Sequence, residues 1–267
     1  MTVWSVCNQK GGVGKTTTAV TLASLLAERG RKTLLIDLDP HASATAYLLG
    51  PAADGPGVLE IFLAALEPPG TPRPAVTSLW APTAQPELLL LRAAAGLAAL
   101  ERRCAGREGF GRALGDALAQ LGDAVSHVIV DCPPTLGLLM INAIAASDRV
   151  LIPVQTEHLA LAGLKRMTQT LDMVERSRGR GIERTVLATL FDQRTRAGNL
   201  ALAELRRDYA PVLWREVVPI DTRLRDAARA GLPAPLHSPD SRAVAVYRRL
   251  LDALLDSPQA ALSAACG

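Results

Sequence analysis

The sequence has 267 residues, 49% of them hydrophobic, which is sufficient for one sizeable core in a single domain covering 1–267. A formal charge of +3 permits an anionic partner but does not require one. Neither a signal-peptide pattern nor an uncharged apolar run of about 20 residues is found, so we exclude secreted and membrane-spanning classes and expect a cytoplasmic protein without membrane insertion.

Cysteine usage leads to the same expectation. Two of the cysteines lie in apolar runs, where a reduced thiol packs as a small hydrophobe. None shows CxxC or metal-ligand spacing, so we expect free thiols in a reducing compartment. The cysteines are Cys7, Cys104, Cys132 and Cys266.

Short continuous apolar runs recur along the chain, as expected for parallel strands that are buried on both faces. Amphipathic stretches long enough for crossover helices lie between them. The alternation predicts an α/β fold with a doubly wound, mostly parallel sheet and helices on both faces. The expected strands are Val3 to Cys7, Thr33 to Ile36, His127 to Val130, Arg149 to Val154, Thr185 to Phe191 and Leu213 to Val218, and the expected helices are Thr16 to Arg29, Leu159 to Arg176, Leu200 to Asp208 and Arg242 to Leu255.

Prolines interrupt any long regular element between about 50 and 86, which we interpret as a surface insertion around one short helix near Val58 to Leu66. The simpler interpretation is a loop without function, and contact with a partner is the alternative. We expect an ordinary surface helix within Leu97 to Leu121. Gly30 is expected to cap the first helix, and Asp221 to be the N-cap of the helix that follows the last strand.

The segment from Asn8 to Thr18 follows the first expected strand and opens the first expected helix, which is the context that a phosphate-binding loop requires. Glycines lack Cβ, so the backbone can turn through positive φ and present successive N–H groups to phosphate oxygens. The helix start adds the positive end of its dipole. We therefore predict that nucleotide phosphates contact Gly11, Gly12, Val13, Gly14, Lys15, Thr16 and Thr17.

Individual side chains of this loop have distinct expected roles. Lys15 should neutralise the β and γ phosphates of ATP, and the Thr16 hydroxyl should ligate Mg²⁺, which prefers oxygen ligands. Thr17 is placed to reach the α-phosphate. The loop departs from the common GxxxxGK[ST] pattern because Gln9 stands at the first glycine position and Lys10 adds a second lysine. Two ammonium groups this close repel each other, a cost that a bound polyphosphate offsets.

Acidic residues follow two of the expected strands. Asp37 and Asp39 lie two residues apart at the end of one strand, at the edge where parallel α/β sheets bind ligands. An acid there can orient the attacking water, and Asp39, beyond the strand, is better placed to move than Asp37. Asp131 ends an apolar run of Walker B form, which delivers an acid to the Mg²⁺ shell. We expect a structural role for His41.

The strings NQKGGVGKTTT, LLIDLDPHASAT, VIVDCPPTLGLLMINA, VLIPVQTEHLALAGL and FDQRT occur in this order and together resemble the ParA/MinD superfamily of deviant Walker ATPases, in its ParA branch. The resemblance implies an ATP-dependent sandwich dimer in which Lys10 reaches the partner's phosphates. It places Asp39 at the position needed for hydrolysis and Asp131 near magnesium through water. We also expect Asp37 to lie behind the residues that bind the metal. The resemblance also implies adenine contacts for Asp192, Arg194, Pro219 and Asp221.

The cargo is less defined by the sequence. The stretch VPIDTRLRDAARAGLPAPLHSPDSRAVAVY departs from the chromosomal ParA pattern and looks more like the chemotaxis-associated ParC subgroup. The resemblance implies a positioning ATPase with slow, partner-stimulated hydrolysis and an adaptor that is either ParB-like or chemotaxis-linked. Nonspecific DNA binding through Arg223, Arg225 and Arg229 is one interpretation and a solvated basic face the other. Nucleoid or polar placement stays open with it.

Two further functions remain open at this point. A MinD-like membrane switch would need a basic amphipathic tail, but the residues from Asp256 to Gly267 contain no Lys or Arg and include a proline. A metabolic ATP-dependent enzyme on the same fold would need a second substrate pocket, or, for an iron–sulfur reductase, cysteines arranged to hold a cluster.

Overall fold

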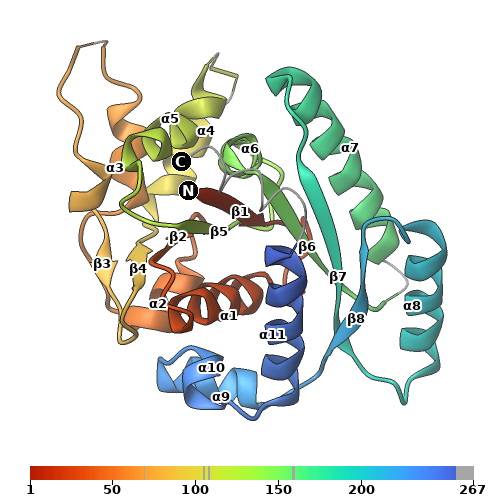
Figure 1. The fold of residues 1–267 in the computed structure, drawn as a ribbon. Helices are drawn as coiled ribbons and strands as arrows, with labels where there is room; N and C mark the ends of the chain where they lie inside the picture. Colours follow the sequence, from red (N-terminus) through yellow and green to blue (C-terminus); the bar gives the residue numbers. More distant parts are fainter. Residues whose placement is uncertain (69, 105, 108, 158–159, 257–267) are drawn as a thin grey trace.

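The computed structural model of the chain describes residues 1–68, 70–104, 106–107, 109–157 and 160–256. Within them an eight-stranded sheet has the order β3-β4-β2-β5-β1-β6-β7-β8, and helices lie on both of its faces (Figure 1). Neighbouring strands are parallel except β3 and β4, which are antiparallel. The strands are β1 (Thr2–Val6), β2 (Thr33–Asp37), β3 (Ala81–Pro82), β4 (Leu88–Leu91), β5 (His127–Asp131), β6 (Arg149–Gln155), β7 (Glu183–Phe191) and β8 (Leu213–Pro219).

The predicted doubly wound α/β class is confirmed. The α-helices are α1 (Lys15–Glu28), α2 (Ser43–Leu49), α3 (Val58–Ala64), α4 (Gly96–Cys104), α5 (Ala113–Leu118), α6 (Leu138–Ala146), α7 (Ala160–Arg178), α8 (Arg196–Asp208), α9 (Arg223–Ala230), α10 (Ala234–His237) and α11 (Arg242–Leu255). Short 3-10 turns cover Val76–Ser78, Phe110–Arg112 and Ala119–Leu121.

Alternation along each strand divides the apolar residues between two cores. On β5, Val128 and Val130 pack with α3 to α8 on one face, whereas Ile129 packs with α1, α2 and α11 on the other. Residues i and i+2 of a strand share a face, so a continuous apolar run supplies both layers. This explains why the strands of the sheet are recognisable as uninterrupted apolar stretches.

Leu88–Leu91 forms β4 beside β2, which the sequence reasoning did not predict. Four leucines fit a buried helix turn as well as a buried strand, and leucine favours helices, so periodicity cannot decide between them. The apolar helix Leu138–Ala146 was missed for the same reason, since its sequence has no polar face.

The expectation of an ordinary surface helix between Leu97 and Leu121 is wrong. Helix α4 ends at Cys104, and α5 begins only at Ala113. Gly106 and Gly109 between them adopt φ values of 78° and 77°, a left-handed conformation that interrupts a helix. Both helices bury leucines against the sheet, so they form part of the core layer.

The 50–86 segment is more than a surface excursion. Its short helix is confirmed as α3, and Phe62 of that helix is completely buried and packs its ring 5.7 Å from the ring of Phe110. Gln85 is also buried and exchanges hydrogen bonds with Ser24 of α1, of 2.6 and 2.9 Å. The prolines therefore border a segment that completes one core and is tied to the other layer.

We expect Phe62→Ala to lower the free energy of unfolding by about 3 to 5 kcal/mol, because it removes a buried ring and leaves a cavity. Leu63, which is 42% exposed, is the matched control, and Leu63→Ala should change the free energy of unfolding by no more than about 0.5 kcal/mol. Urea unfolding of both variants measures the difference. Equal, small effects would contradict the assignment of α3 to the core.

Candidate nucleotide site

The strand register brings the phosphate loop and the acids together. Asp131, the last residue of β5, lies opposite Val6 of β1 on one side and opposite Asp37 of β2 on the other. The loop that follows β1 and the turn that follows β2 therefore emerge at one edge of the sheet, on either side of Asp131. This is the edge where parallel α/β sheets bind ligands.

The loop has the backbone shape that phosphate binding needs. Gly12 and Gly14 have φ values of 74° and 90°, and Gly14 is the N-cap of α1. Gly11 does not have a positive φ, contrary to expectation, but a Cβ built on any of these three glycines would meet no atom within 4 Å. Open space thus lies in front of the loop, next to the positive end of α1.

Side chains outside the loop hold it in place. The Thr189 hydroxyl of β7 donates to the carbonyl oxygen of Val13 at 2.8 Å. The Asn8 amide donates to the carbonyl oxygen of Pro153 on β6 at 2.6 Å, and its Oδ1 accepts the N–H of Lys10 at 3.0 Å. The loop is therefore anchored to neighbouring strands of the sheet.

The two lysines differ in their surroundings. Lys15 is buried, and its Nζ donates to the carbonyl oxygen of Lys10 at 3.1 Å. Burial lowers the pKa of Lys15, although the negative charges of Asp131 and Asp39 act in the opposite direction. Lys10 is partly exposed, and its Nζ forms an ion pair of 2.6 Å with Glu157 after β6. The structure thus places one desolvated ammonium group inside the site and one at its rim.

Asp131 is the most unusual acid in the site. It is buried, and neither carboxylate oxygen has a hydrogen bond of normal geometry within the part of the chain that the structure describes. Burial raises its pKa well above the ordinary value, as does the charge of Asp37, while the Thr16 hydroxyl and the Lys15 ammonium favour the charged form. Buried carboxylates without donors are costly, so a cation or its water ligands would satisfy this group.

These residues fit Mg²⁺. No group of three or more His, Cys, Asp or Glu side chains is gathered for a metal among the described residues. Mg²⁺ in phosphate sites needs only one or two protein ligands, because phosphates and water complete its shell. The Thr16 hydroxyl and the unpartnered Asp131 carboxylate are oxygen donors of that kind.

Asp37 and Asp39 are held differently. Asp37 is completely buried, and its carboxylate accepts the N–H and the hydroxyl of Thr45 at 2.7 and 2.8 Å and the N–H of Asp39 at 3.2 Å. Burial raises its pKa to about 6 despite these donors. Among the described residues, Oδ1 of Asp39 accepts only from His41, through its N–H at 3.0 Å and its ring at 2.9 Å. Asp37 thus fixes the start of α2, and Asp39 is held by its own loop.

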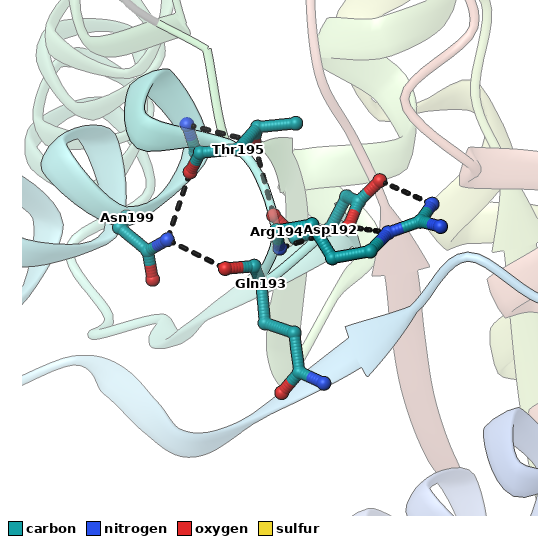
Figure 2. Close-up of polar contacts among 6 residues, drawn as sticks. Asp192, Gln193, Arg194, Thr195 and Asn199 are labelled. Atoms are coloured by element: carbon teal, nitrogen blue, oxygen red, sulfur yellow. Dashed lines mark hydrogen bonds and ion pairs between the residues drawn. The ribbon is translucent and has the colours of Figure 1, made fainter.

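The residues predicted to contact adenine lie on neighbouring loops. Figure 2 shows Arg194 turned onto Asp192, with Nε and Nη2 at 2.9 and 2.8 Å from the carboxylate oxygens. Their pairing holds the pKa of Asp192 at about 2. Thr195 and Asn199 close the same turn, since the Asn199 amide donates to the carbonyl oxygens of Gln193 and Thr195 at 2.8 Å (Figure 2). The turn is preorganised, and its adenine contact stays a prediction.

Pro219 pairs with Phe191 at the ends of β8 and β7, which brings its loop beside that turn. Asp221 caps the start of α9 as expected, although Thr222, which makes no side-chain cap hydrogen bond, lies between it and the helix. The Asp221 carboxylate accepts the N–H of Arg223 at 3.0 Å and the hydroxyl of Ser241 at 2.8 Å. Asp221 thereby ties the starts of α9 and α11 together, and its contact with adenine also stays a prediction.

Sequence reasoning missed several supporting residues. Thr45, Thr189 and Glu157 act through contacts across 8, 176 and 147 positions of the chain. No local motif marks such residues, because the fold alone brings them to the loop. His41 was visible, but its hydrogen bonds to Asp39 were not.

Comparison with known proteins gives consistent results. An AAA domain family model matches residues 1–183. The chromosome partitioning protein ParA of Myxococcus xanthus is 35% identical, with 92% of this chain and 84% of that protein covered. The sporulation initiation inhibitor protein Soj of Bacillus subtilis is 35% identical, with 91% and 94% covered. Cobyrinic acid a,c-diamide synthase from Mycobacterium smegmatis, solved with a bound ATP analogue and magnesium, is 32% identical, with a TM-score of 0.79 and 96% and 94% covered.

We expect Asp131→Asn to stabilise the protein by about 1 to 3 kcal/mol near pH 8 without nucleotide or magnesium, because it removes an unpartnered buried charge. The raised pKa means that the folded state retains protons longer than the unfolded chain, so wild-type stability falls as pH rises through this window. The advantage of the variant should therefore be smaller near pH 5. Urea unfolding at both pH values measures it.

Asp37→Asn is the matched control. Asp37 has the same burial but three donors, so the amide would lose acceptors and should destabilise the protein. If both variants were stabilised equally, the unpartnered state of Asp131 would not be the cause.

Proposed function

The chain belongs to the ParA family of P-loop ATPases, and from this premise we propose that it is an ATP-switched dimer that positions or segregates a cellular cargo. The observation that carries the proposal is the combination at one sheet edge of an open glycine loop, a desolvated Lys15, an unpartnered Asp131 and a rim lysine, Lys10. Such a site is electrostatically suited to a polyphosphate with its cation.

The cofactors are ATP and Mg²⁺, as in the 32% identical structure with a bound ATP analogue and magnesium. In this proposal the loop N–H groups and Lys15 hold the phosphates, with Thr17 at the α-phosphate. The cation is held by Thr16 directly and by Asp131 through water. Asp37, on the strand next to Asp131, does not bind the cation directly. When bound, Mg²⁺ neutralises charge on the β and γ phosphates.

Lys10 is the residue that we propose to act on the partner subunit. Its ion pair with Glu157 joins two partly exposed side chains, and exposed pairs contribute at most about 1 kcal/mol. The phosphate oxygens of ATP bound to a second subunit would therefore be a stronger partner for the Lys10 ammonium group. The exchange would make dimer formation depend on the γ-phosphate.

Hydrolysis would then act as the timer of the switch. Asp39 lies near Lys15 and Asp131 and would orient the attacking water. We propose that turnover is slow until an activator on the cargo binds. The names of the relatives favour chromosome partitioning over chemotaxis, and a ParB-like or chemotaxis-linked adaptor is the partner class.

A MinD-like membrane switch is the less supported alternative. Within the described residues, none of the helices combines the length and apolar character needed to cross a bilayer. The tail on which a surface-bound helix was considered, residues 257–267, lies outside the described residues.

A second candidate function is ATP-dependent amide synthesis, which the name of the 32% identical M. smegmatis protein suggests. An amide synthase consumes ATP in proportion to the amide formed, whereas a switch hydrolyses ATP without a second small substrate. ADP release with and without cobyrinic acid and an amide donor separates the two functions. Release that requires both small molecules would favour the synthase.

To test the switch, Asp39→Ala serves as a background that blocks turnover. We expect Mg-ATP, but not Mg-ADP, to double the mass of this protein in light scattering. Adding Lys10→Ala should abolish the dimer, because the ammonium group that neutralises the partner's phosphates is lost.

Lys32→Ala is the matched control, since Lys32 is exposed and lies just before β2, at the edge of the sheet opposite the loop that follows β1. It should leave the ATP-dependent dimer unchanged. A mass that ignores nucleotide in every variant would contradict the switch and favour the metabolic candidate.

DNA is a proposed anchoring surface for the dimer. Arg225 and Arg229 lie four residues apart on α9, both exposed and without an ion pair among the described residues. Arg223 faces elsewhere, and its Nη1 donates to the carbonyl oxygen of Asp240 at 3.2 Å. The first two arginines are therefore the better candidates for phosphate contacts.

We expect the double change Arg225→Ala and Arg229→Ala to weaken ATP-dependent DNA binding equally for unrelated sequences. The slope of log affinity against log salt should fall by about 1.8, since each lost phosphate contact removes about 0.9. The control is Arg248→Ala with Arg249→Ala, whose guanidinium groups are paired with Glu28 and Glu216. If the control weakened binding as much, net charge rather than α9 would be responsible.

A further inference from the structure

The carboxylate of Asp39 is held from one side only. Both of its hydrogen-bond donors belong to His41, and both act on Oδ1: the backbone N–H at 3.0 Å and ring Nδ1 at 2.9 Å. Over the residues that the structure describes, no donor is found for Oδ2. One oxygen of the carboxylate is therefore fixed while the other keeps its lone pairs for an incoming group.

The local backbone sets this arrangement. The N–H of Ala42 donates to the carbonyl oxygen of Asp39 at 2.8 Å, and Ala42 adopts a φ of 53°, which is uncommon for a residue other than glycine. The turn places His41 directly against Asp39, just before α2. The geometry thus results from a tight, strained turn at the site itself.

Burial separates a positioning role from a packing role. The His41 side chain is 82% exposed, whereas that of Asp39 is 12% exposed. An exposed imidazole contributes little to the core, so its contact with Asp39 is its principal interaction. This exposure favours a positioning role for His41 over the structural role that we expected from the sequence.

We propose that His41 is a positioning residue for ATP hydrolysis, a proposal that rests on the function proposed above. Its ring N–H holds Oδ1 of Asp39 so that Oδ2 accepts a hydrogen bond from the attacking water. The water oxygen bonds to the γ-phosphorus while the bond from that phosphorus to the β,γ-bridging oxygen breaks. ADP leaves, and the protons of the water pass to the phosphate product and to solvent.

The test compares His41→Ala, which removes the ring donor but keeps the backbone N–H, with His41→Asn, whose Nδ2 occupies the place of ring Nδ1. His237→Ala is the matched control, since His237 is also exposed and its ring forms a hydrogen bond with the neighbouring Ser238 instead of with an acid. Single-turnover hydrolysis with protein in excess gives the rate and the half-saturating ATP concentration. Light scattering of each variant with Mg-ATP reports dimer formation.

We expect His41→Ala to slow hydrolysis by about threefold to tenfold, as for loss of one hydrogen bond to a charged group, with half-saturation and dimer formation unchanged. His41→Asn and His237→Ala should stay within about twofold of wild type. A wild-type rate for His41→Ala, or no recovery with His41→Asn, would overturn the inference. A wild type that neither hydrolyses ATP nor dimerises would instead overturn the proposed function.

Discussion

The site depends on charges that the protein buries without neutralising them. Asp131 has no hydrogen bond of normal geometry among the described residues, Asp37 beside it is also buried, and Lys15 is desolvated at the base of the loop. Burial of any of these groups is costly, and for Asp131 hydrogen bonds do not offset the cost as they do for Asp37. A phosphate chain with a divalent cation supplies negative charge for Lys15 and positive charge for Asp131. Ligand binding and the stability of the folded chain are therefore linked at this edge of the sheet.

The rest of the fold holds this unfavourable arrangement in place. The parallel register of the strands places Asp131 between the ends of β1 and β2. An apolar layer covers each face of the sheet around it. The Thr18 hydroxyl of α1 lies 2.8 Å from the hydroxyl of Tyr247 on α11, both buried, so the helix that carries the phosphate loop is fastened to the last helix. Packing on both sides thus offsets the electrostatic cost of burying these groups.

The sequence was sufficient for the fold class and for the chemistry of the loop, because both are written in local patterns. Glycines, Lys15 and Thr16 follow one another, and apolar runs mark the strands that carry Asp37 and Asp131. It was insufficient where one pattern fits both a helix and a strand, as at Leu88–Leu91, which forms a strand. It also could not show long-range contacts such as that of Thr189 with Val13. Those depend on strand order, which no short motif encodes.

The contrast between Asp37 and Asp39 suggests how one turn can be both rigid and responsive. Asp37 accepts two hydrogen bonds from Thr45, whose hydroxyl in turn accepts the N–H of Ala93, so the end of β2 is tied to α2 and to the segment after β4. The Asp39 carboxylate, within the described part of the chain, is held only by His41 of its own loop. In the proposed switch, a γ-phosphate or a partner surface would therefore move Asp39 without disturbing the sheet. Since α2 contacts α9, the helix that carries Arg225 and Arg229 packs on the element that Asp37, and not Asp39, holds in place.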